Sequence, residues 1–290
     1  MAVQALAVNP LTLIVTRALA GLCLGISVAA LMAYNFEVGG SMGMFASFGS
    51  LGWLLGDIIA IFFHSYAGLF FLSAASCSLA FAISLSLKEP EYRLSPRPAT
   101  VPVNSRPLKP DTMRVARRNI LVYLPFFLRN LGATMVWVIL PLFFVSLGAS
   151  TVWIAILSSI NTGGQFITMM FVERLREYRL FILGFVFSAL VFVAYSRAAN
   201  FVQIIPVQAL LAVAWSCLYV GALLLLLKHN EEKATSTGIL FSTTSIAGAI
   251  GPFLGGLVSQ FWGYQPLMYL ASGLCVSGLM IASMRMKWKA

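Results

Sequence analysis

Long apolar runs separated by short polar connections dominate the chain. Nine such runs cover residues 11–34, 43–63, 67–87, 120–146, 152–172, 180–196, 203–227, 237–260 and 266–284. Each run can cross about 30 Å of hydrocarbon as a helix, which takes roughly 17–25 residues. No strand-like alternation is present, and in lipid a helix satisfies its own backbone hydrogen bonds. The pattern predicts an all-α, polytopic membrane protein with nine transmembrane helices.

One connection differs from the others in length and composition. Residues 88–119 hold six of the twelve prolines of the chain together with eight Lys or Arg side chains. This composition predicts an extended, semi-rigid linker with little packed structure. It would divide the chain into a part with three helices, residues 1–87, and a part with six helices, residues 120–290.

The overall composition agrees with a membrane protein. Hydrophobic residues make up 60% of the chain and charged residues 10%, whereas soluble domains are nearer half apolar and a quarter charged. This balance excludes a secreted disulfide scaffold, a cytosolic enzyme and a disordered regulator. The four cysteines lie far apart inside apolar runs without metal-ligand spacing, and we expect no metal and no other cofactor.

The basic residues are distributed asymmetrically. When alternate connections are assigned to opposite sides of the bilayer, Arg197 is the single Lys or Arg outside the apolar runs that falls on the far side. Basic residues favour the cytoplasmic side, which predicts a cytoplasmic C-terminus and places the N-terminus of this chain outside a cell (plasma) membrane. The net charge of +10 therefore indicates topology and contact with the lipid bilayer, not nucleic-acid binding.

The two parts of the chain are related in sequence. Residues 39–88 align without a gap on residues 238–287, with ten identical positions, and this predicts an internal repeat of the first three helices in the last three. Small residues at three- and four-residue spacing let helices approach closely, so we expect the glycines to form packing and gating contacts between the two parts, with the proline as a kink site. These residues are Gly49, Gly52, Gly56, Gly248, Gly251, Pro252, Gly255 and Gly256.

Three charged residues lie inside the apolar runs, and two of them have similar depths. Arg17 and Asp57 both lie about 9 Å below the outer face of the bilayer at 1.5 Å per residue. They could form a structural salt bridge or a switch that responds to protons or substrate. Because ionisable groups in a bilayer are expensive, both are functional candidates, and structural pairing is the favoured alternative.

The third charge, Arg129, is expected near the midplane, where no acid shares its depth. Such an arginine is tolerated where water or an anionic ligand meets it, so we expect Arg129 to bind the anionic part of a substrate. The alternative is an arginine that snorkels to backbone carbonyls.

Neighbouring polar and aromatic residues extend this candidate site. Asn130 and Trp137 follow the arginine at helical spacing. Gln208, Trp215 and Tyr219 recur at i, i+7 and i+11 of a later run. We expect these residues to line one cavity, and the alternative for the aromatic residues is a lipid-facing or packing role.

Enzymatic functions are not indicated. An intramembrane aspartyl protease needs two membrane acids, and Asp57 is the single acid within the runs. The chain has no HExxH motif and no phosphate-binding loop. We therefore expect a protein that is not an enzyme and has no catalytic residue.

Several motifs resemble those of the major facilitator superfamily. Residues 17–25 (RALAGLCLG) resemble the fourth-helix signature of that family, and the glycines of 49–56 and 248–256 resemble its fifth and eleventh helices. Glu173 and Arg174 open a connection that resembles the acidic–Arg loop after the eighth helix. The resemblance implies helices four to six in residues 1–87, and a complete six-helix C-terminal bundle in residues 120–290.

The resemblance also implies a function. It implies secondary transport of a small solute by alternating access, with proton coupling and export as further expectations. Trp53 and Asp57 depart from the fifth-helix motif, and this weakens the expectation of export. Nothing corresponds to helices one to three, so we expect Met1 to be an internal methionine of a longer transporter, with a natural nine-span protein as the alternative. The alternative is a non-transporting membrane scaffold or receptor, or an inactive transporter fragment.

Overall fold

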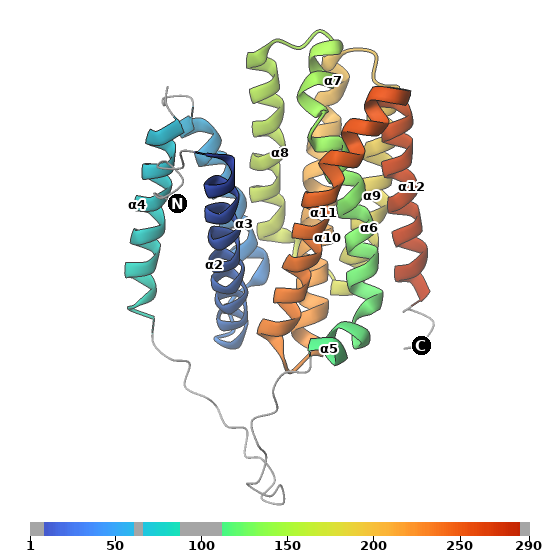
Figure 1. The fold of residues 1–290 in the computed structure, drawn as a ribbon. Helices are drawn as coiled ribbons and strands as arrows, with labels where there is room; N and C mark the ends of the chain where they lie inside the picture. Colours follow the sequence, from blue (N-terminus) through green and yellow to red (C-terminus); the bar gives the residue numbers. More distant parts are fainter. Residues whose placement is uncertain (1–8, 61–65, 88–111, 285–290) are drawn as a thin grey trace, which may run out of the picture.

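A computed structural model describes residues 9–60, 66–87 and 112–284 of the protein, and in these ranges every regular element is a helix. Nine of the described helices are long and apolar enough to cross a membrane. The protein is therefore a multi-pass α-helical membrane protein, which confirms the predicted fold class at this level. The helices run up and down in alternation (Figure 1).

Three helices precede the linker: α2 (Pro10–Glu37), α3 (Met42–Ala60) and α4 (Tyr66–Ser84). Helix α2 begins with a capping box, in which the Asn9 side chain accepts a hydrogen bond from the Thr12 amide at 2.8 Å. This bond satisfies one of the backbone donors that a helix N-terminus leaves unpaired.

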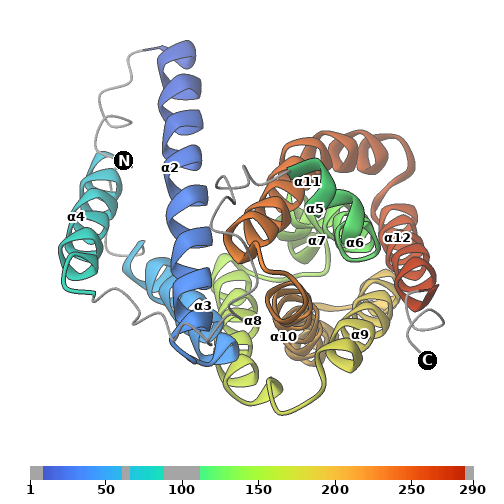
Figure 2. The same cartoon turned by 90° about the horizontal axis from the view of Figure 1, so that it is seen from below.

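The part after the linker contains the remaining helices. They are α5 (Thr112–Arg118), α6 (Ile120–Trp137), α7 (Leu140–Ser146), α8 (Thr151–Val172), α9 (Glu177–Arg197), η1 (Phe201–Gln203), α10 (Ile204–His229), α11 (Lys233–Trp262) and α12 (Tyr264–Met284). Helix α10 packs on α9 and α8, while α12 packs on α6 and α9, and α11 on α6. Figure 2 shows these helices gathered into one bundle.

Two helix boundaries differ from the prediction. The run 120–146 is split into α6 and α7, because Pro141 has no amide to bond the carbonyl of Trp137 and its ring crowds that carbonyl. The end of the linker also contains a helix, α5, whose Val115 is buried. Expecting little packed structure throughout 88–119 was therefore wrong for Thr112–Arg118, and residues 88–111 lie outside the described part.

The three N-terminal helices do not form a bundle of their own. Helix α3 packs on α8 and α2 packs on α11, while α4 packs extensively on none of the other described helices. In the apolar stretch that contains α10, 78% of the residues are buried, whereas in the stretch of α4 the share is 0%. Figures 1 and 2 show α4 standing apart from the rest, so the partial bundle predicted for 1–87 is not seen.

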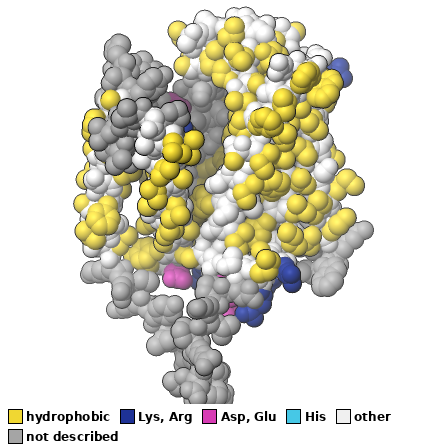
Figure 3. Space-filling model, viewed as in Figure 1, with side chains coloured by type: hydrophobic (Ala, Val, Ile, Leu, Met, Phe, Trp, Pro, Cys, Tyr) yellow, Lys and Arg dark blue, Asp and Glu magenta, His cyan; other side chains and the backbone are white. Residues whose placement is uncertain are grey.

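Most charged residues of the described part of the chain gather at one end of the molecule. Figure 3 shows Lys and Arg side chains grouped at the lower end of the helices, beneath a broad apolar surface. We call this end, where α5 and the α10–α11 and α8–α9 connections lie, the basic end. The other end carries Arg197, the last residue of α9.

Candidate functional site

Arg129 is completely buried inside the six-helix bundle. It lies on α6, and its Nε donates a hydrogen bond to the Ser188 hydroxyl of α9 at 3.0 Å. The two terminal nitrogens, Nη1 and Nη2, have no hydrogen-bond partner among the described residues. A guanidinium stays charged in proteins and offers five N–H donors, so Arg129 presents a buried, largely unsatisfied cation.

An aromatic cluster covers this guanidinium. The Trp215 ring of α10 lies beside it, with the guanidinium carbon 5.0 Å from the ring centroid. Tyr219 stacks on Trp215 at 5.2 Å between centroids, and Phe126 and Trp137 contact the same indole at 6.1 and 6.4 Å. The cation–π contact stabilises the charge by about 2 kcal/mol when it is desolvated, but it leaves the N–H donors unpaired.

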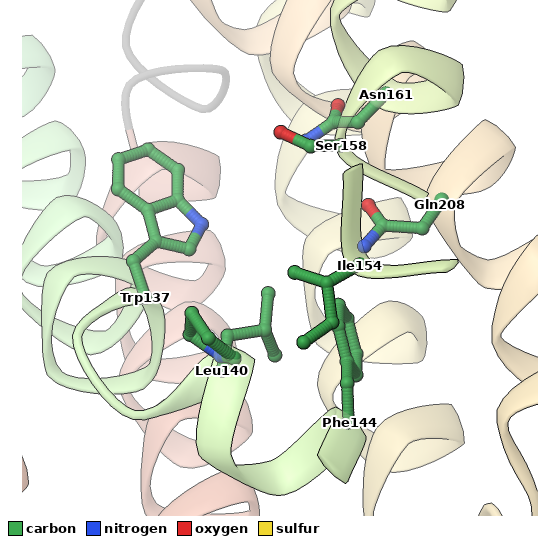
Figure 4. Close-up of a pocket in the computed structure, with 8 residues that line it drawn as sticks. Trp137, Leu140, Phe144, Ile154, Ser158, Asn161 and Gln208 are labelled. Atoms are coloured by element: carbon green, nitrogen blue, oxygen red, sulfur yellow. The ribbon is translucent and has the colours of Figure 1, made fainter. Parts of the chain in front are cut away.

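A cavity of about 250 Å³ lies next to this cluster, at the end opposite the basic end. Figure 4 shows Trp137 facing Ser158, Asn161 and Gln208 across it. Gln208 is 2% exposed and its Oε1 accepts no hydrogen bond. Trp137 lines the cavity and also touches Trp215, so the cavity is separated from Arg129 by these two indole rings.

The structure brings some of the predicted site residues together, but not all of them. Arg129, Trp215 and Tyr219 meet in the aromatic cluster, whereas Gln208 lines the cavity. Trp137 belongs to both. The sequence did not indicate Ser188 or Phe126, because their role depends on how α9 and α6 rotate against α10. A buried serine among apolar residues was the available signal for Ser188.

Asn130 does not join this site through a side-chain contact. It is 1% exposed, and its Nδ2 donates to the Phe126 carbonyl one turn earlier on α6 at 2.8 Å. Its Oδ1 accepts no hydrogen bond. The amide is therefore tied to its own helix.

Arg17 and Asp57 lie away from the aromatic cluster, on α2 and α3. Both side chains are exposed, and among the described residues no ion pair joins them. The predicted salt bridge is therefore not formed. Equal depth did not bring the two side chains together, because α2 and α3 meet close to the connection that joins them at the other end.

The glycine motif behaves differently in the two repeats. A Cβ added at Gly255 would overlap the Met135 carbonyl oxygen of α6, and one at Gly251 would overlap the Thr134 hydroxyl. The equivalent glycines of α3, Gly52 and Gly56, have no atom within 4 Å of such a Cβ. The same is true of Gly49, Gly248 and Gly256. The close contacts lie within the six-helix bundle, so the prediction that they join the two parts was wrong.

The proline of this motif does not end its helix. Pro252 lies inside α11, and α11 is one helix from Lys233 to Trp262. Close packing of α11 on α6 accompanies this position, and neighbouring helices help to compensate for a missing backbone hydrogen bond in lipid.

The two parts of the chain are joined at the basic end by Glu173. Its carboxylate accepts hydrogen bonds from the Gly43 amide at 2.9 Å and the Met42 amide at 3.3 Å, and also from the Ser41 hydroxyl. These donors form the N-terminus of α3, where a negative charge is favourable by about 0.3–1 kcal/mol. The sequence singled out Glu173, but it did not indicate that the N-terminus of α3 would be its partner.

Two other contacts complete the junction. Lys233 of α11 forms an ion pair with Glu37 of α2, with 3.6 Å between Nζ and Oε1. The Gly43 backbone approaches the Met169 carbonyl so closely that a Cβ would overlap it. Arg174 lies in the turn after α8, where it is exposed over the Phe171 ring near the end of that helix. A shallow pocket of about 510 Å³ lies at the surface beside Glu37 and Lys233.

No known family model matches the chain, and no curated protein matches it. The class established by the structure is a multi-pass helical membrane protein. A narrower assignment depends on the geometry described above.

Proposed function

We propose that the protein is a secondary transporter of the major facilitator type, which moves a small solute across the membrane by alternating access. The basic end faces the cytoplasm in this proposal, because basic residues favour that side. The observation that carries the proposal is the combination of a junction at the basic end with a cavity at the opposite end.

The junction is built from contacts that can open. Glu173 caps α3 through hydrogen bonds and Lys233 pairs with Glu37 across a partly exposed gap. Exposed ion pairs contribute about 0–1 kcal/mol, and a helix-terminal carboxylate adds a similar amount. These polar contacts therefore contribute only a few kcal/mol to holding the two parts together at this end, which a bound solute can offset through its preference for one state.

Cysteine labelling tests this proposal directly. Ser158 lines the cavity and is exposed, whereas Ser47 of α3 is fully buried near the basic end. Single cysteines at these positions, in a background with the four native cysteines replaced by alanine, are labelled with a charged maleimide in proteoliposomes. We expect Glu173→Gln to raise labelling at Ser47→Cys and to lower it at Ser158→Cys.

Glu177→Gln provides a matched control at the same end. Glu177 pairs with Lys228 at 3.1 Å, and both residues lie within the six-helix bundle. Its loss leaves the junction intact, so labelling at both reporter positions should not change. If Glu173→Gln and Glu177→Gln gave the same labelling, or if only one reporter responded, alternating access would be rejected.

The proposal also includes coupling of transport to protons, and Asp57 on α3 is the residue to test for this coupling. Export and coupling would be measured as solute flux driven by an imposed pH gradient in proteoliposomes. An Asp57→Asn variant with an unchanged response to that gradient would exclude Asp57 from coupling.

A second candidate function is a membrane scaffold or receptor that does not transport. It is favoured by the sparse packing of α2, α3 and α4, whose apolar side chains are largely exposed. A scaffold needs no exchange between two accessible states. It would therefore show constant labelling at both reporter positions in every variant.

A further inference from the structure

The buried guanidinium of Arg129 lacks partners for its most directional donors. The side chain is 0% exposed, and among the described residues it forms no ion pair. Its one hydrogen bond uses Nε, which leaves the Nη1 and Nη2 groups unpaired. A buried charge without partners is costly. A carboxylate or sulfonate can satisfy two parallel N–H groups of an arginine at once.

The ring beside this guanidinium belongs to a flat, apolar cluster. Phe126, Trp137 and Tyr219 all contact the Trp215 ring that lies beside the guanidinium. Aromatic faces favour offset-stacked or edge-to-face contacts with another ring. The cluster therefore suits a planar apolar group attached to the acid.

The cavity supplies an approach to the arginine. Trp137 lines the cavity and touches Trp215, and Trp215 covers Arg129. Trp215 and Tyr219 are only partly buried, unlike most of α10. Entry of a ligand from the cavity to the Nη1 and Nη2 donors would require the Trp215 side chain to move.

We propose that Arg129 binds the acid group of a small organic monoanion whose planar apolar part packs in the aromatic cluster. A single cation in an apolar site favours one negative charge over two. This inference names the class of solute that the proposed transporter would carry. The transport of that solute rests on the proposed function, whereas its binding to Arg129 does not.

Binding of benzenesulfonate to the full chain in lipid nanodiscs tests the inference. This probe stays ionised, carries a flat ring and is compared with neutral methyl phenyl sulfone and with ring-free methanesulfonate. Buffer anions are held at the same low concentration in every sample, because a small anion can compete for Arg129. We expect benzenesulfonate to bind about tenfold or more tightly than either comparison compound, since the sulfone loses the charged hydrogen bond and methanesulfonate loses the ring contact.

Three variants separate binding by Arg129 from a structural role. Arg129→Gln should weaken benzenesulfonate binding about tenfold or more, and Arg129→Lys should weaken it less, because the charge remains but the paired donors do not. Arg197→Gln, the same change at an exposed arginine, should leave binding unchanged. Cooperative thermal unfolding of each variant checks that it is folded.

Further support would come from fluorescence. Binding should shift the tryptophan emission of the wild-type chain, and Trp215→Phe should abolish most of that shift. Equal binding by wild type and Arg129→Gln, or no binding of benzenesulfonate by the folded wild type, would overturn the inference. Binding without uptake into proteoliposomes would support the inference and reject transport, whereas uptake of other solutes without benzenesulfonate binding would do the reverse.

Discussion

Substitution of Gly255 by alanine should destabilise the protein, and the structure allows an estimate. A Cβ at this position would overlap the Met135 carbonyl oxygen and lie 2.7 Å from its carbon and 2.8 Å from its Cα. Because these are backbone atoms of α6, they cannot move aside as a flexible side chain would. Overpacking of this kind costs typically about 1–3 kcal/mol, and alanine regains roughly 0.5–1 kcal/mol as the better helix residue. The expected net loss is about 0.5–2 kcal/mol.

Gly56 is the matched control because it occupies the equivalent position of the internal repeat. Nothing lies within 4 Å of a Cβ built on it, so Gly56→Ala should stabilise the protein slightly or leave it unchanged. The two variants carry the same chemical change and differ in whether a neighbouring helix is present. Their effects should therefore have opposite signs.

Buried cysteines provide the assay. Cys217 and Cys275 are buried, whereas Cys23 and Cys77 are exposed. With the exposed pair replaced by alanine, a thiol-reactive dye reports unfolding during heating in detergent micelles. A loss of 1 kcal/mol corresponds to a fall in Tm of about 2–4 °C for chains of 150–250 residues, a scale that serves here as a guide. Equal destabilisation by both substitutions would refute the reasoning, because it would mean that the α3 glycine face is also packed.

Three other sets of described contacts can be tested by substitution. Asn119 and Asn230 are buried and exchange amide hydrogen bonds of 2.8 and 3.2 Å, so either alanine variant should lose about 1–3 kcal/mol of unfolding free energy. The double variant should lose less than the sum in a double-mutant cycle, and strict additivity would argue against the pair. Lys233→Met should lower stability by less than about 1 kcal/mol, with a smaller effect in high salt, because its ion pair with Glu37 is partly exposed; a larger, salt-independent loss would contradict this. Gly43→Ala should separate α3 from α8 and raise hydrogen exchange at the start of α3, and unchanged exchange would show that the approach is looser than described.

Much of the candidate site could be predicted from the chain, but its geometry could not. Arg129 stood out because a charge within an apolar run is rare, and the spacing of Trp215 and Tyr219 placed them on one face of a helix. That the guanidinium meets Trp215 and Ser188 depends on how three helices rotate against one another. Residue spacing along one helix carries no information about that rotation.

The pairing of Arg17 with Asp57 failed for a related reason. Depth along a helix is a one-dimensional quantity, whereas a salt bridge also needs the two helices to be close at that depth. The junction through Glu173 was similarly hidden, because its partners are backbone amides of α3. Every residue except proline offers such an amide, so no side-chain pattern marks the site.

The sequence alone determines the number and length of the membrane spans and the gathering of basic residues at one end. The reason is that in lipid each span must satisfy its own backbone hydrogen bonds and exclude most charges. The tertiary structure, by contrast, determines which glycines pack against a neighbouring helix. Gly56 and Gly255 have the same place in the repeat, yet α6 covers one and no described helix covers the other. Contacts between spans depend on shape and rotation, and hydrophobicity alone does not distinguish a lipid tail from another apolar helix.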